Sequence, residues 1–65
     1  MKTYQVRARV WNNVTQQYEE TVYQHVGRMY TAENGQLKIW GQLVKQVVAE
    51  YSPGNWINII EAPDA

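Results

Sequence analysis

The chain has 65 residues, of which 45% are hydrophobic, 18% are charged and none is cysteine, and this predicts one small domain over residues 1–65. Six basic and six acidic residues cancel to a net charge of zero, which argues against a strongly basic nucleic-acid coat protein and against a disordered acidic tail. A domain this small without disulfides depends on a compact core or on a partner subunit, so a homo-oligomer stays open.

The composition and the first segment both favour β-structure. Val, Ile and Thr, together with three Trp and five Tyr, suit a pleated surface. Residues 4–11 alternate in character, which predicts a strand with one face turned to the core. The apolar face comprises Tyr4, Val6, Ala8 and Val10, and the opposite face comprises Gln5, Arg7, Arg9 and Trp11.

The next segments predict two hairpins separated by a bend. A polar loop over 12–16 contains asparagines that can bond their own backbone, which favours a chain reversal. Residues 18–26 alternate without a fully apolar face, as is typical of an edge strand. Gly27 interrupts the alternation and predicts a bulge or bend before a third strand over 28–31. Asn34-Gly35 then carries the strongest hairpin signal in the sequence and leads into a fourth strand over 36–40.

Residues 42–51 allow two interpretations. Leu43, Val47 and Tyr51 form a stripe at helical spacing, whereas the β-branched valines of this segment favour a strand. We favour a short helix slightly. In the strand alternative, the segment would meet the last strand through 52–55, where Pro and Gly suit a type II turn.

The last apolar run, residues 56–60, predicts a strand well inside the sheet. The expected fold is therefore mainly β, or α+β if residues 42–51 are helical. We expect a small antiparallel sheet of four to five strands, curled into a barrel or covered on one face by the helix.

Catalytic and metal-binding patterns are missing from the sequence. His25 is the only imidazole, and Glu19 and Glu20 would point to opposite faces of a regular strand. No phosphate-binding or metal-ligand motif occurs, so we expect a non-enzymatic protein without cofactor or metal. The chain also lacks an apolar leader and an uncharged run long enough to cross a bilayer, so we expect a cytoplasmic protein with no membrane partner.

Basic and aromatic side chains suggest one functional hypothesis. In the first and fourth predicted strands they occupy the face opposite the apolar one, and the bend at Gly27 could turn the third strand toward them. Cations for phosphates and rings for base stacking, worth about 1–3 kcal/mol per base, are what binding of single-stranded nucleic acid requires. The predicted nucleic-acid-binding residues are Arg7, Arg9, Trp11, Arg28, Tyr30, Lys38 and Trp40.

The alternative is a protein–protein interaction module. The chain has eight Trp and Tyr in all but no Phe, and rings with a polar atom are enriched at protein interfaces. A small β domain can also pair its edge strand with another chain, which would give a homodimer or dock the domain on a host protein. Such a domain would act as an inhibitor or regulator of that protein by occupying part of its surface.

Residues 26–30, 33–39 and 54–60 give the order strand, acidic-Asn-Gly hairpin, strand and terminal Gly-aromatic-apolar strand. In this order the chain resembles a loose class of small phage- and plasmid-encoded β-rich proteins. The resemblance covers about half of the chain, and this sequence departs from it by inserting residues 42–52 before the last strand. It implies a mobile-element origin and single-stranded DNA binding, and it assigns no role to any single residue.

Overall fold

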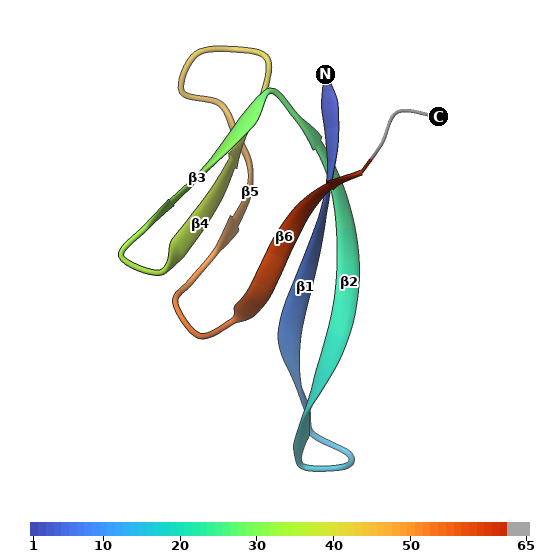
Figure 1. Cartoon of the computed structure of the whole chain (residues 1–65). Coiled ribbons are helices and arrows are strands. Elements are labelled where there is room, and N and C mark those ends of the chain that lie inside the picture. Colours follow the sequence, from blue (N-terminus) through green and yellow to red (C-terminus); the bar gives the residue numbers. More distant parts are fainter. Residues whose placement is uncertain (63–65) are drawn as a thin grey trace.

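The computed structural model describes residues 1–62 as two three-stranded antiparallel sheets that pack face to face (Figure 1). The strands are β1 (Lys2–Asn12), β2 (Gln17–Gly27), β3 (Met29–Glu33), β4 (Gln36–Trp40), β5 (Val47–Tyr51) and β6 (Trp56–Ala62). The first sheet has the order β2-β1-β6 and the second the order β3-β4-β5. The predicted mainly β fold is confirmed, but six strands in two sheets replace the expected four or five strands in one.

The core lies between the two sheets and is small. Val6 from β1 and Leu37 and Ile39 from β4 have no exposed surface, and Tyr4 and Ala8 are almost as buried. Half-buried side chains from the later strands pack around them, namely Ala49, Tyr51, Trp56 and Ile59. The alternation of β1 therefore places its apolar face in the core as predicted, except at its end. Val10 is exposed because β6 pairs with β1 only as far as Ala8.

The predicted turns form for the expected local reasons. The Asn12 side-chain oxygen accepts a hydrogen bond from the Val14 amide at 2.9 Å, which stabilises the loop between β1 and β2. Asn34 and Gly35 both have positive φ, 53° and 82°, the geometry of a two-residue hairpin turn. Gly54 has a φ of 84°, and the Asn55 amide donates to the Ser52 carbonyl, as the predicted type II turn requires.

The bend at Gly27 carries the chain from the first sheet into the second. A Cβ at this position would lie 2.7 Å from Ile39 Cγ2 and 2.7 Å from the Trp40 carbonyl oxygen. The next amide, that of Arg28, donates to the same Trp40 carbonyl at 2.8 Å. Glycine is therefore needed because two backbones approach closely at the bend. The predicted bend is confirmed, and it explains why the strands divide into two sheets.

The preferred helix over residues 42–51 is wrong, and the strand alternative is correct for Val47–Tyr51, which form β5. Residues 42–46 are a loop, in which Leu43 is 68% and Val44 85% exposed. Lys45 adopts a left-handed φ of 64° in this loop after β4, and β5 then pairs with β4. As a strand, this segment satisfies the backbone groups along one edge of β4, which a helix would leave unpaired. Within residues 1–62 the secondary structure is all strand and turn, so no helix there could span a membrane.

Of the two edge strands of the first sheet, one was predicted to lie at an edge and the other was not. β2 lies at an edge, as its sequence predicts. β6 was expected inside the sheet, but it forms the other edge, and its Ile57 and Ile60 are exposed. An apolar run in so small a domain therefore does not imply burial on both faces, because most side chains lie near the surface.

Candidate functional site

The seven predicted nucleic-acid-binding residues do not share one face. Arg7 and Arg9 follow the buried Val6 and Ala8 of β1 and so point away from the core on the side of the first sheet, and Trp11 continues this face of the strand past the end of the core. Lys38 and Trp40 alternate with the buried residues of β4 and point away on the side of the second sheet. Because the core lies between the two sheets, these two groups emerge on opposite sides of the molecule.

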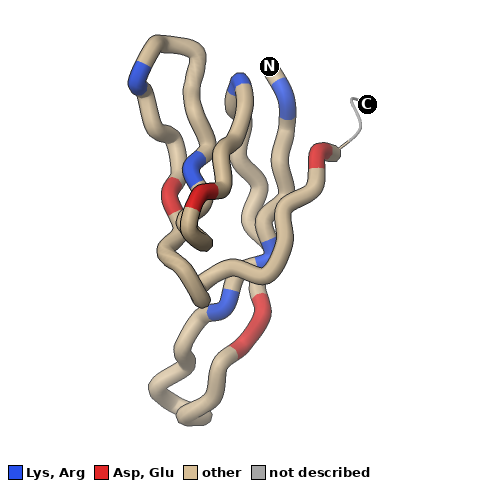
Figure 2. Tube along the Cα trace, turned by 60° about the vertical axis from the view of Figure 1, so that its left-hand side comes forward, with Lys and Arg blue, Asp and Glu red and all other residues tan. Residues whose placement is uncertain are grey.

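The remaining two predicted residues lie in neither group. Arg28 is at the bend, where its Nε donates to the Gly41 carbonyl at 3.3 Å. Tyr30 is opposite Ile39 in the β3–β4 ladder and so faces the core side, where its ring packs edge-on against Tyr4. The expectation of a single basic-aromatic face is therefore wrong. Figure 2 shows the same spread, with basic residues distributed over the chain and acidic residues between them.

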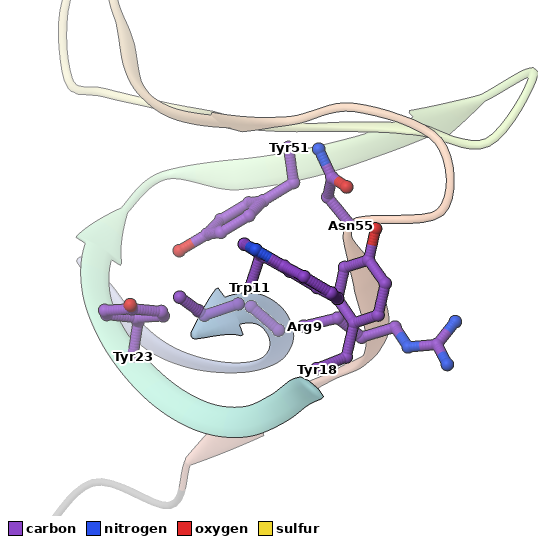
Figure 3. A pocket seen from close by; sticks show the side chains of 8 residues that line it. Arg9, Trp11, Tyr18, Tyr23, Tyr51 and Asn55 are labelled. Atoms are coloured by element: carbon purple, nitrogen blue, oxygen red, sulfur yellow. The ribbon is translucent and has the colours of Figure 1, made fainter. Parts of the chain in front are cut away.

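An aromatic groove instead opens where the β1–β2 hairpin extends past the core (Figure 3). Its volume is about 450 Å³, and it is lined by Ala8, Arg9, Val10, Trp11, Tyr18, Tyr23, Tyr51 and Asn55. β6 pairs with β1 only up to Ala8, so the hairpin beyond this point is a two-stranded ribbon. Two-stranded ribbons twist more strongly than wider sheets, and this brings side chains from both faces of β1 into one groove.

Trp11 and Tyr18 form one wall of the aromatic groove. They lie opposite each other in the β1–β2 ladder, with ring centroids 5.0 Å apart at an angle of 69°. Trp11 is 48% exposed, and Figure 3 shows its ring between Tyr18 and Tyr51. An edge-to-face pair of this kind is worth about 0.5–1.5 kcal/mol beyond the burial of its area. The pair therefore holds the Trp11 ring in place while leaving part of it accessible.

Tyr51 and Tyr23 form the facing wall, and Tyr51 ties it to the core. Their ring centroids are 6.4 Å apart, and the Tyr51 hydroxyl lies 2.6 Å from Nε2 of His25. Partial burial raises the pKa of Tyr51 above its usual value of 10.0, and the neighbouring Tyr23 raises it further. Tyr51 is therefore a neutral hydrogen-bonding group at physiological pH, with its ring against the core and its position set by β5.

Arg9 is the charged residue among those lining the groove. Its guanidinium carbon lies 5.6 Å from the centroid of the Tyr18 ring, and its backbone amide donates to the Asn55 carbonyl at 2.9 Å. Glu20 is the residue opposite Arg9 in the β1–β2 ladder, but its Oε2 lies 4.0 Å from Nη1 of Arg7, outside the groove. Arg9 therefore supplies one positive charge at the rim of an otherwise uncharged, aromatic surface.

Of the six aromatic and polar residues that line the groove, Arg9 and Trp11 are also among the residues predicted from the sequence to bind nucleic acid. Tyr18 could have been found, because a hairpin reversal over residues 13–16 places it opposite Trp11. Tyr23, Tyr51 and Asn55 could not, because they reach the groove only through the packing of β5 and of the turn before β6 against the hairpin.

Within residues 1–62, no group of three or more His, Cys, Asp or Glu side chains is placed to hold a metal ion. The residues that line the groove offer rings, hydroxyls, one amide and one guanidinium, groups that occur in ligand-binding pockets. Comparison of the chain with protein-family models, with curated proteins and with solved structures finds no match.

Proposed function

We propose that the protein is a protein–protein interaction module whose aromatic groove binds an extended segment of a partner. The observation that carries this proposal is the convergence of Trp11, Tyr18, Tyr23 and Tyr51 on one open groove. Trp and Tyr dominate the binding energy of protein interfaces because they bury a large area at a small entropic cost. An extended segment suits the groove because its backbone can bond to tyrosine hydroxyls and to Asn55 while its side chains lie between the rings.

Arg9 indicates which charged group the partner segment carries. Its guanidinium lies over the Tyr18 ring, and the carboxylate of Glu20, the residue opposite Arg9 in the β1–β2 ladder, lies 4.0 Å from Arg7. A carboxylate of the bound segment would therefore meet an available bidentate donor at the rim of the groove. We propose that the partner segment carries apolar residues that bind in the groove and one acidic residue that pairs with Arg9. We also propose that the partner is cytoplasmic, because a chain without cysteine suits a reducing compartment.

Single-stranded nucleic acid is the second candidate, and Arg9, Tyr18 and Trp11 favour it. A guanidinium beside two exposed rings is a small stacking platform of the kind that binds bases without sequence preference. The platform has few cations, however, because Lys38 and Arg28 lie elsewhere. Contacts to one or two phosphates would give a slope of log K against log salt between about −0.7 and −1.4, which supports only weak binding.

A selection on a phage-displayed random-peptide library, followed by titration of the selected peptides, tests the proposal. Peptides with apolar residues next to an Asp or Glu should be enriched. Their affinity should fall about 30-fold or more in Trp11→Ala, the loss that corresponds to about 2 kcal/mol for a hot-spot residue. The matched control is Trp40→Phe, which changes a ring on the opposite side of the molecule and should leave the affinity unchanged.

A parallel titration with fluorescent oligothymidylate separates the two candidates. Binding of the oligonucleotide that is lost in Trp11→Ala, with no peptide enriched, would favour the nucleic-acid function. Selected peptides that bind Trp11→Ala and the wild type equally well would exclude the groove as the site.

A further inference from the structure

The free edge of β2 is the longest unprotected strand edge in the described part of the chain. β2 has eleven residues, pairs with β1 without any register shift and lies at the edge of the first sheet. Figure 1 shows β2 along one side of the molecule. It contains neither proline nor lysine, the residues that most often prevent an edge strand from pairing with another chain. The backbone groups along this edge are therefore available to a further strand.

The other three sheet edges of residues 1–62 carry features that discourage pairing. β3 and β5 have only five residues each, and the β4–β5 ladder also contains a register shift. The β1–β6 ladder contains a register shift between Arg7 and Ala8. Short strands and bulges are two of the ways in which proteins protect sheet edges. β2 differs from the other edges in having neither.

We infer that β2 pairs antiparallel with β2 of a second copy, which joins two three-stranded sheets into one six-stranded sheet. The inferred register places Val22 opposite Val22 of the second copy, on the two-fold axis at the middle of the strand. This register overlaps the whole of β2. The inference is argued from the backbone edge of β2 and not from the proposed function of the aromatic groove, although Tyr18 and Tyr23 of β2 line that groove.

In this register the outward-facing residues of β2 meet suitable partners. Tyr18, Val22 and Val26 are 62%, 53% and 54% exposed, so the separate chain leaves three large apolar side chains exposed on one face of this strand. Tyr18 would lie opposite Val26 of the second copy, and the two Val22 side chains would lie opposite each other. Aromatic and β-branched pairs are among the cross-strand pairs that stabilise antiparallel sheets.

The polar residues of β2 are complementary in the same register. Glu20 would lie opposite Gln24 of the second copy, and Glu19 opposite His25, so each carboxylate faces a side chain that can donate a hydrogen bond. A shift of two residues in either direction would instead place Glu20 opposite Val22 or Val26. In the inferred register no residue lies opposite a residue of like charge. Repulsion between like charges, which opposes the pairing of edge strands, is therefore absent from this register.

Oxidation of single-cysteine variants tests both the pairing and its register, because the native chain has no cysteine. Opposite residues of antiparallel strands have Cα atoms about 4.5–5.5 Å apart, within the range that a disulfide can span. Val22→Cys is therefore expected to form a disulfide-linked dimer as its main oxidised species. Gln24→Cys is the matched control, since its two copies would be offset by four residues, roughly 14 Å along the strands, and should stay unlinked.

Sedimentation of the unmodified chain supplies the second measurement. The inference predicts a concentration-dependent dimer, and Val22→Lys, which places two ammonium groups on the axis, should weaken it about tenfold or more, or by about 1.4 kcal/mol. A wild-type chain that sediments as a monomer at every concentration would overturn the inference. Equal crosslinking of Val22→Cys and Gln24→Cys would overturn the register.

Discussion

At the scale of single residues, Tyr51 connects the core, the aromatic groove and the first sheet. Its ring packs against the core cluster, contacts Tyr23 across the groove, and its hydroxyl lies within hydrogen-bonding distance of His25 on β2. No strand ladder joins β5 to β2, so this contact between Tyr51 and His25 links the two sheets through side chains. A change at Tyr51 is therefore expected to affect both stability and the shape of the groove.

Tyr51→Phe should change the pH dependence of stability. Burial raises the pKa of the folded-state hydroxyl above 10.0, so its stabilising contribution is fully present below pH 10 and is lost as the pH rises through the raised value. Near pH 8 the variant should have a lower free energy of unfolding, by about 0.5–1.5 kcal/mol for the lost hydrogen bond. Urea titrations between pH 8 and pH 11 should show this difference shrinking, and a difference that stays constant would contradict the prediction.

At the scale of secondary-structure elements, the bend between β2 and β3 determines how the strands divide into two sheets. The chain turns at Gly27 because the backbone of Trp40 and the side chain of Ile39 occupy the space that a Cβ would need. The same bend leaves β2 at the edge of the first sheet and brings β3 to β4. The free edge of β2 and the two-sheet core therefore have a common origin.

Gly27→Ala should destabilise the fold. The added methyl group would lie 2.7 Å from a backbone oxygen that is itself hydrogen-bonded to Arg28, so relief requires a backbone shift. Overpacking of this kind costs about 1–3 kcal/mol in free energy of unfolding, which urea titration measures. Gly54→Asn is the control, because its Cβ would meet nothing within 4 Å and asparagine tolerates the positive φ of 84°. Equal losses in the two variants would show that close approach is not the reason for glycine at the bend.

At the scale of the whole molecule, the small core makes stability depend on very few side chains. Within residues 1–62, five hydrophobic residues are buried, and three of these have no exposed surface. A chain of this length is expected to have a free energy of unfolding of about 3–10 kcal/mol, at about 0.05–0.15 kcal/mol per residue. Each core residue therefore contributes a large fraction of the total, and an additional interface would add stability by mass action.

The two leucines of the chain allow a matched comparison. Leu37 has no exposed surface, so Leu37→Ala should cost about 2–5 kcal/mol and leave the domain largely unfolded or close to its limit. Leu43 lies in the exposed loop after β4, so Leu43→Ala should change the free energy of unfolding by no more than about 0.5 kcal/mol. Circular dichroism with thermal unfolding distinguishes them, and similar melting temperatures would contradict the core described here.

Local patterns in the sequence were sufficient to predict five of the six strands and the turns, but not β5. The alternation in β1 follows directly from the period of two in an extended chain, and the turns at Asn34-Gly35 and Pro53-Gly54 follow from the backbone angles that glycine allows. These features depend on residues close together in the chain. Sequence reasoning could therefore establish a mainly β domain and the bend at Gly27.

Only the tertiary structure decided how the strands pair and which of their side chains lie together. Residues 42–51 fit both a helical and an extended pattern, with the helix slightly favoured, and pairing with the edge of β4 selected the strand for residues 47–51. The basic and aromatic residues of β1 and β4 both alternate with buried ones, but only the packing of the sheets shows that they point to opposite sides. The aromatic groove likewise combines Trp11 with Tyr51, which are distant in sequence. Such contacts depend on the relative placement of whole strands, which no local pattern encodes.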